Sequence, residues 1–321
     1  MTIAIKFINP FGTGQYNGLI TETLTPYVRE GTEVVVANTS NCPENIDYYY
    51  SKHLIEEAIF EEVIKAEEER FDAVIVGCCY DPGVRVAREL VDIPVIGPLE
   101  AAMYFAPYFG HDYVVVTDHH KAVPYLRDLV RLYGQQANCL DVSCINWFVA
   151  DMIKDTDGVA RDAMKAAEAA MTNNGAEAAI LGCTIISASY EKLILQTGEQ
   201  RNRAVLNPNT CALKMAESLA DLSRQGVYQI SRGGITSSSS NITPSSMRRC
   251  ENGSGTVGRA RFENDRRFRS SACSALRQQA DPLRFRSWLK VEWLTRSSSI
   301  RSYRRSLQIR RYREPTHREP R

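Results

Sequence analysis

The amino-acid sequence predicts an α/β protein of two pseudo-symmetric lobes with parallel sheets, followed by a basic tail of a different character. Three observations predict it. Apolar runs alternate with helical patterns through residues 1–228, a segment around one cysteine is repeated around another, and the composition changes near residue 229. The 321 residues suffice for one large or two medium domains.

The expected strands and helices alternate along residues 1–228. Continuous apolar strands with helices between them indicate a parallel sheet that is covered on both faces. The strands are expected at residues 3–8, 33–38, 73–77, 94–97, 113–117, 178–182 and 204–207. The clearest helical patterns between them cover residues 54–69, 84–91, 122–134 and 158–175.

One part of this sequence occurs twice. AVIVGCCYDPG (73–83) resembles AAILGCTIISA (178–188), and in both copies an apolar strand leads to Gly-Cys and a turn. A second matched unit follows each copy, at 92–106 and at 203–217, with a proline where a helix is expected to start. Ligands of open α/β sheets bind beyond the carboxyl ends of the strands. The duplication therefore predicts two thiols on opposite walls of one cleft.

Residues 229–321 differ from the rest in charge and composition. They hold 21 Lys and Arg, 20 of them Arg, against 7 Asp and Glu, whereas residues 1–228 hold 18 Lys and Arg against 31 Asp and Glu. One interpretation is a basic tail that binds nucleic acid or an anionic membrane. The Ser-rich stretch 236–255 and the lack of any helical or strand period favour a disordered segment, or translation past a frameshift or a lost stop codon. We therefore expect no nucleic-acid partner.

Composition excludes further classes of protein. There is no apolar run of about 18 residues, so we expect no membrane span. The start MTIAIKFINP does not resemble a signal peptide, which favours a cytoplasmic protein. The nine cysteines are scattered and form no CxxC pair, which predicts free thiols and no metal site.

Two opposed thiols suit the inversion of a carbon that carries an acidic hydrogen. A base removes the proton from one face and an acid returns one to the other, and exchange of these roles serves both enantiomers. The unperturbed thiol pKa of about 8.5 lies near working pH and falls at a helix N-terminus. Backbone amides there also stabilise a developing enolate oxygen. This chemistry needs no cofactor, and we expect none.

The motifs GCCYDPG (77–83), EAAMYFA (100–106), VVVT (114–117) and GCTIIS (182–187) resemble those of the hydantoin racemase branch of the aspartate/glutamate racemase superfamily. The resemblance covers residues 1 to about 228. It implies an isomerase that racemises 5-substituted hydantoins or the ureide allantoin, a small-molecule substrate, and a homo-oligomer.

The resemblance also implies two Rossmann-like lobes, with the last helix returning to the first lobe. The first lobe then comprises residues 1–98 with 208–228, and the second comprises residues 99–207. In the family the cysteine directly after glycine is catalytic, which here implies Cys78 and Cys183.

Other residues are candidates for substrate contact. Asn9 matches a family motif after the first strand, although INPFGTG (8–14) departs from that motif at Phe11 and Gly12, which bears on substrate choice. Thr117 ends a strand, Thr184 follows the second cysteine as a candidate oxyanion donor, and Glu100 either accepts a substrate N–H or opens a helix. The full set of substrate-binding candidates is Asn9, Cys79, Gly83, Glu100, Thr117 and Thr184.

Several of these positions also have a structural interpretation. Cys79 is expected to point away from Cys78 as a core residue. Asp81 is expected to cap the helix at 84–91, with Gly83 allowing close approach. His119 and His120 are interpreted as surface residues.

Three other functions stay open. An aspartate or glutamate racemase on the same scaffold needs cations for the substrate carboxylates, and the recognisable cleft segments are poor in Lys and Arg. A related decarboxylase uses only one cysteine. A non-catalytic small-molecule-binding protein also has two lobes around a cleft, but it needs no reactive thiol pair.

Overall fold

The computed structural model describes residues 2–44, 47–199, 201–227 and 229–231. The interpretation of the tail as disordered or spurious concerns residues that lie, apart from 229–231, outside this described part. Within the described part, no helix is both long and apolar enough to cross a membrane.

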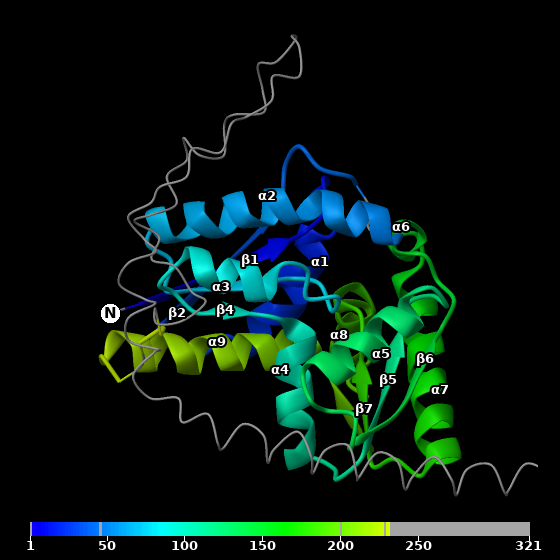
Figure 1. Cartoon of the computed structure of the whole chain (residues 1–321). Helices are drawn as coiled ribbons and strands as arrows, with labels where there is room; N and C mark the ends of the chain where they lie inside the picture. Colours follow the sequence, from blue (N-terminus) through cyan, green and yellow to red (C-terminus); the bar gives the residue numbers. More distant parts are fainter. Residues whose placement is uncertain (1, 45–46, 200, 228, 232–321) are drawn as a thin grey trace, which may run out of the picture. The chain divides into compact units, whose positions relative to one another are not determined.

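The first sheet lies in the N-terminal part of the chain. Its strand order is β2-β1-β3-β4, and all its strands are parallel. The strands are β1 (Ile3–Asn9), β2 (Thr32–Asn38), β3 (Ala73–Val76) and β4 (Val95–Ile96). The accompanying helices are α1 (Asn17–Leu24), α2 (Tyr49–Glu68), α3 (Val84–Leu90) and α4 (Pro98–Phe105). Figure 1 shows α2 and α3 on one side of this sheet.

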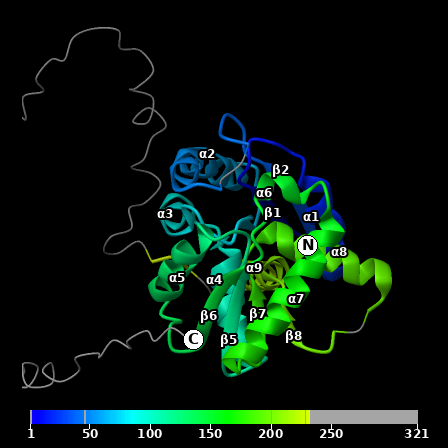
Figure 2. The same cartoon turned by 90° about the vertical axis from the view of Figure 1, so that its right-hand side faces the viewer.

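The second sheet has the strand order β6-β5-β7-β8 and is also parallel throughout. Its strands are β5 (Tyr113–Thr117), β6 (Cys139–Cys144), β7 (Ala178–Leu181) and β8 (Ala204–Leu206). The helices that follow α4 are α5 (Ala122–Leu132), α6 (Val149–Met152), α7 (Thr156–Asn174), α8 (Thr184–Thr197) and α9 (Pro208–Arg224). In Figure 2, α5 and α7 flank this sheet on opposite sides.

The two sheets have the same connectivity. β1 and β5 occupy equivalent central positions, and β3 and β7 are the equivalent strands next to them. All residues of β3 and β7 are buried because helices cover both faces, as a parallel sheet requires. This confirms the predicted α/β fold with two pseudo-symmetric lobes and parallel sheets.

The last described helix returns to the first sheet. α9 packs on β1, β3 and β4 and against α4, and Figure 1 shows it on the face opposite to α2. Its buried apolar residues include Ala212, Leu213, Ala216 and Ala220. This packing accords with counting 208–228 in the first lobe, although the lobe boundaries themselves stay a prediction.

Candidate active site

Both equivalent strands lead into Gly-Cys, and close packing requires the glycine. Gly77 follows β3 and Gly182 follows β7, and each amide donates a 2.7 Å hydrogen bond to the carbonyl of a residue in the adjacent central strand. A Cβ on Gly77 would lie 2.0 Å from Cε1 of Phe7, and one on Gly182 would lie 2.6 Å from Cγ1 of Val115. The neighbouring strand therefore leaves no room for a side chain before either cysteine.

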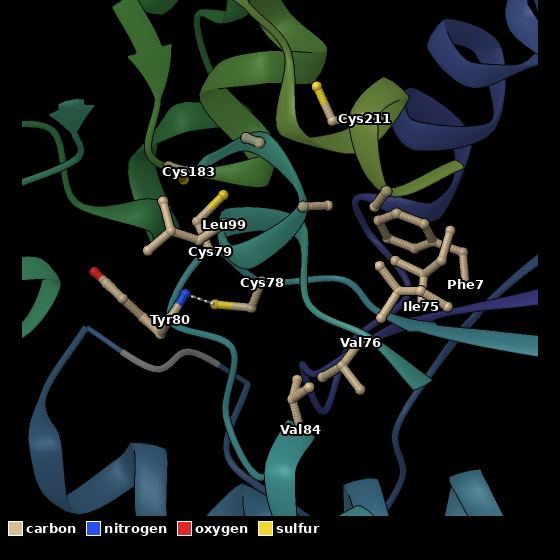
Figure 3. Packing of buried hydrophobic residues seen from close by; sticks show 14 of the residues in the cluster. Phe7, Ile75, Val76, Cys78, Cys79, Tyr80, Val84, Leu99, Cys183 and Cys211 are labelled. Atoms are coloured by element: carbon tan, nitrogen blue, oxygen red, sulfur yellow. Dashed lines mark hydrogen bonds between the residues drawn. The ribbon is translucent and has the colours of Figure 1, made fainter. Parts of the chain in front are cut away.

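Cys78 lies in the loop between β3 and α3, and it is 6% exposed. The Tyr80 amide donates a hydrogen bond to Cys78 Sγ at 3.5 Å (Figure 3). Burial raises the pKa of the Cys78 thiol, while the Tyr80 amide and the Lys52 ammonium act to lower it. A Cys78 thiolate would therefore have two stabilising groups beside it.

Cys183 is the residue directly before α8, and it is 8% exposed. Burial raises the pKa of its thiol well above the ordinary value, and the Asp118 carboxylate adds to the rise. The backbone amides of Ile186 and Ile185, in the first turn of α8, act in the opposite direction. The positive end of the helix thus favours a thiolate at Cys183.

Cys79 lies against the second lobe. It is 1% exposed, and its Sγ donates a weak hydrogen bond to the Leu181 carbonyl at 3.9 Å. Burial raises its pKa well above the ordinary value, with Cys183 the largest charged contributor. Figure 3 shows Cys78 directed towards the Tyr80 amide and Cys79 directed elsewhere. The structure thus brings Cys78, Cys79 and Cys183 into one buried region, with Cys79 in contact with the opposite lobe.

Two buried threonines connect the strand ends. The Thr184 hydroxyl donates a 3.0 Å hydrogen bond to the Gly77 carbonyl, which joins the two Gly-Cys turns across the lobes. The Thr117 hydroxyl lies 3.0 Å from both the Gly182 carbonyl and Oδ1 of Asp118. Both hydroxyls therefore have protein partners, and their contact with a substrate stays a prediction.

Asp81 caps a different helix from the one expected. Its carboxylate accepts hydrogen bonds from the amides of Leu99 at 3.2 Å and Glu100 at 2.9 Å, which begin α4, and from the Tyr133 hydroxyl at 2.9 Å. The residue before α3 is Gly83, and within the described residues this helix start has no side-chain cap hydrogen bond. The cap expected on the helix at 84–91 is therefore wrong, because Asp81, with a φ of 43°, directs its side chain to α4. Burial raises the pKa of Asp81 to about 7.

Glu100 and Gly83 have structural partners. The Glu100 carboxylate pairs with both terminal nitrogens of the Arg88 guanidinium, at 3.2 and 2.5 Å. Gly83 has a φ of 66°, and a Cβ there would lie 2.6 Å from Cε1 of Phe60. Glu100 therefore opens α4 as an ion-pair partner of Arg88, and Gly83 permits a tight turn. Their contact with a substrate stays a prediction.

Asn9 ends β1 and is fully buried. Its Nδ2 donates a 2.8 Å hydrogen bond to Oδ1 of Asn17, while its own Oδ1 has no hydrogen-bond partner in the described part of the chain. Phe11, one of the two departures from the family motif, packs against Tyr16 with the ring centroids 5.4 Å apart. Asn9 is a predicted substrate-binding residue, and its Oδ1 could accept a hydrogen bond from a substrate N–H.

A buried polar cluster next to the thiols was not predicted from the sequence. The Tyr80 hydroxyl donates a 2.6 Å hydrogen bond to Oδ2 of Asp118, and Nε2 of His119 lies 3.6 Å from Oδ1 of Asp47. Lys52 Nζ lies 3.8 Å from the centroid of the Tyr80 ring. The one sequence signal was the run YYYSK (48–52), which places a lysine beside three tyrosines.

His119 corrects an expectation. Its ring is 1% exposed and stacks on Phe148 with a centroid distance of 5.0 Å, whereas His120 is exposed. The surface interpretation is therefore wrong for His119, because the loop after β5 turns it inwards between Asp47 and Phe148. Among the described residues, neither ring nitrogen of His119 has a hydrogen-bond partner.

The same cluster contains a set of atoms suited to a metal ion. One donor atom each from Asp47, Asp118 and His119 lies within 4.8 Å of the others. However, Asp118 already accepts hydrogen bonds from the Tyr80 hydroxyl and the His119 amide. The Lys52 ammonium also balances part of the carboxylate charge. We therefore retain the prediction that no metal is used.

The fold and the cysteines define a two-lobed α/β protein with buried thiols at equivalent strand ends. Residues 5–216 match the family described as Asp/Glu/Hydantoin racemase. The chain is 31% identical to a hydantoin racemase of Rhizobium meliloti over 215 residues, 67% of this chain and 88% of the relative. It is 30% identical to a hydantoin racemase of Pseudomonas sp. (strain NS671) over 221 residues, 69% and 87% of the two chains.

A solved structure agrees with these relatives. The allantoin racemase from Pseudomonas fluorescens matches with a TM-score of 0.65 and 27% identity, over 74% of this chain and 97% of that one. The chain belongs to the Asp/Glu/Hydantoin racemase family, which confirms the resemblance to its hydantoin racemase branch. It is accordingly a racemase, and hence an isomerase.

Proposed function

We propose that this protein inverts the C5 centre of 5-substituted hydantoins, or the related centre of allantoin, by proton transfer between two cysteines and without a cofactor. The observation that carries the proposal is the position of Cys78 and Cys183. They follow the equivalent strands β3 and β7, both are buried, and negative charge on Cys78 raises the pKa of the Cys183 thiol. The hydantoin and allantoin racemases among the similar proteins support this choice of substrate.

The proposed reaction balances in two proton transfers. The Cys78 thiolate takes the C5 proton, and the electron pair of the C–H bond moves into an enolate on the adjacent carbonyl. The Cys183 thiol then gives its proton to the opposite face of C5, which leaves Cys78 protonated and Cys183 as the thiolate. The other enantiomer uses the same two groups in reverse order. The amides of Ile185 and Ile186 stabilise the charge on the Cys183 side.

The test is substitution of each cysteine. Cys78→Ala and Cys183→Ala should each abolish racemisation of a hydantoin, because each removes the acid or base on one face. Cys211→Ala is the control, since Cys211 is an equally buried thiol in α9 outside the proposed pair. Polarimetry measures net inversion, and proton NMR in deuterium oxide measures exchange at C5. Full turnover in both directions by either variant of the proposed pair would contradict the two-cysteine mechanism.

Racemisation of aspartate or glutamate is a second candidate with its own support. The cleft segments are poor in Lys and Arg, but the buried Lys52 ammonium lowers the pKa of Cys78 and is the cation that a substrate carboxylate would pair with. Polarimetry on a hydantoin, allantoin, aspartate and glutamate separates the candidates. A protein that only binds a ligand would invert none of them. When its thiols are alkylated with and without ligand, such a protein would also show no unusually reactive pair of cysteines.

A further inference from the structure

Lys52 is a buried cation in the first turn of α2. It is 3% exposed, and no carboxylate of the described residues forms an ion pair with it within 4.0 Å. Its ammonium instead lies over three aromatic rings, 3.8 Å from the centroid of Tyr80, 5.0 Å from that of Tyr125 and 5.1 Å from that of Tyr49. Burying an ammonium without an ion pair is costly, and ring contacts recover only part of that cost.

Tyr80 connects this ammonium to Cys78. Its ring lies under Lys52 Nζ, and its backbone amide donates the hydrogen bond to Cys78 Sγ. The ring is held at both ends, by the hydrogen bond from its hydroxyl to Asp118 and by an edge-on contact with Tyr125 at 5.3 Å between centroids. The lysine and the thiol are therefore held by the same fixed residue.

The charged groups that act on Lys52 come from three loops. Burial lowers the pKa of Lys52, and Cys78 opposes this effect more strongly than either carboxylate does. The groups are Cys78 after β3, Asp118 after β5 and Asp47 before α2. The two carboxylates have other partners, His119 and the Val149 amide for Asp47 and the Tyr80 hydroxyl for Asp118.

The two cysteines differ in what surrounds them. Cys183 stands at the N-terminus of α8, a helix of 14 residues, whose first amides favour a thiolate. Cys78 has no such helix end, because a turn with left-handed residues at Asp81 and Gly83 separates it from α3. An enzyme that works in both directions needs two thiols of similar acidity, so the Cys78 side requires another source of positive charge.

We propose that Lys52 is the positioning residue that stabilises the Cys78 thiolate, in place of the helix N-terminus that Cys183 has. This proposal rests on the two-cysteine function above. The Lys52 charge favours loss of the Cys78 thiol proton to solvent. It also keeps Cys78 as the thiolate until Cys78 takes the substrate proton. Lys52 itself transfers no proton.

The experiment measures the alkylation of each cysteine by iodoacetamide as a function of pH, with tandem mass spectrometry to separate Cys78 from Cys79 and Cys183. In the full chain, Lys52→Met should slow labelling of Cys78 about tenfold near neutral pH and move its pH midpoint upwards by about one unit. Labelling of Cys183 should stay within about twofold, because the effect of the charge is local. Lys52→Arg should restore most of the rate at Cys78.

Lys121→Met is the matched control. Lys121 also lies over a tyrosine ring, 4.3 Å from the centroid of Tyr48, but it is exposed and acts on neither thiol. It should leave both labelling rates unchanged. Lys52→Gln repeats the test with a neutral polar side chain if the methionine variant does not fold, and circular dichroism checks each variant.

The outcomes separate this proposal from the proposed function. An unchanged pH midpoint of Cys78 in Lys52→Met or Lys52→Gln overturns the role of Lys52, even if Cys78→Ala abolishes racemisation. Equal slowing at Cys78 and Cys183 also overturns it, because it indicates a general structural effect. If Cys78→Ala retains racemisation in both directions, the two-cysteine function fails, whatever Lys52 does to the thiol.

Discussion

At the scale of single residues, glycine sets the direction of each candidate thiol. Gly77 and Gly182 precede the cysteines, and both pass close over a buried side chain of the adjacent central strand. Any larger residue would push the strand end, and the cysteine with it, away from the opposite lobe. The sequence alone predicted the two Gly-Cys turns from the internal repeat. It did not predict that packing against Phe7 and Val115 makes the glycines necessary.

Gly77→Ala is expected to lower the free energy of unfolding by about 1–3 kcal/mol and to reduce racemisation. The added methyl meets the Phe7 ring, which is fully buried and has no space to move into. Gly18→Ala is the control, because Gly18 lies in α1 with no atom within 4 Å of an added Cβ. It should stabilise the protein by about 0.5–1 kcal/mol. Urea unfolding measures both changes, and equal stability of the two variants would contradict this account.

At the scale of secondary structure, burial explains which elements the sequence revealed. The apolar strands and the helices with one apolar face were predicted near their observed positions. β6 was missed because it is an edge strand with polar residues and only one buried position. α8 was not recognised as a helix because its first eight residues are all buried, so no polar face marks a helical period.

The loop GCCYDPG also joins elements that the sequence keeps apart. Asp81 was expected to cap the next helix, yet it caps α4, 17 residues further along the chain. Its carboxyl is buried between the start of α4 and Tyr133, a position that no local sequence rule reveals. Asp81 therefore fixes the turn after Cys78 to the helix that leads to the second lobe.

Asp81 should make stability depend on pH. Its pKa is about 7 in the folded protein against an ordinary value of 3.8, so folding favours the protonated form. The contribution of Asp81 to the free energy of unfolding is fully present below about pH 4 and is lost as the pH rises through about 7. Asp81→Asn keeps a neutral side chain and should remove this decline, which is about 4 kcal/mol for a difference of about three pKa units.

Urea unfolding at acidic and at mildly alkaline pH checks this prediction. Asp128→Asn serves as the control, since its side chain is 75% exposed on α5, where it pairs with Arg131. It should leave the pH dependence as in the wild type. If Asp81→Asn keeps the full decline in stability between the two pH values, the carboxyl does not titrate as described.

At the scale of the whole molecule, the repeat predicted the symmetric features and missed the asymmetric ones. The equivalent sheets and strand-end cysteines follow from duplication. Lys52 and Asp47 come from one lobe and His119 and Asp118 from the other, and none of the four belongs to the repeated motif. Their meeting depends on how the lobes pack, which a pattern within one sequence does not encode.

The final prediction concerns the extent of the chain that racemisation needs. α9 ends at Arg224 and buries Ala212, Leu213, Ala216 and Ala220 on the first sheet, and every candidate site residue lies before it. A chain ending at residue 228 should therefore keep the racemisation rate and thermal midpoint of the full chain. A chain ending at residue 207 should lose both, because it uncovers that apolar face of the sheet. Polarimetry and thermal unfolding decide between these outcomes. Loss of racemisation in the first deletion would show that residues 229–321 contribute to the enzyme.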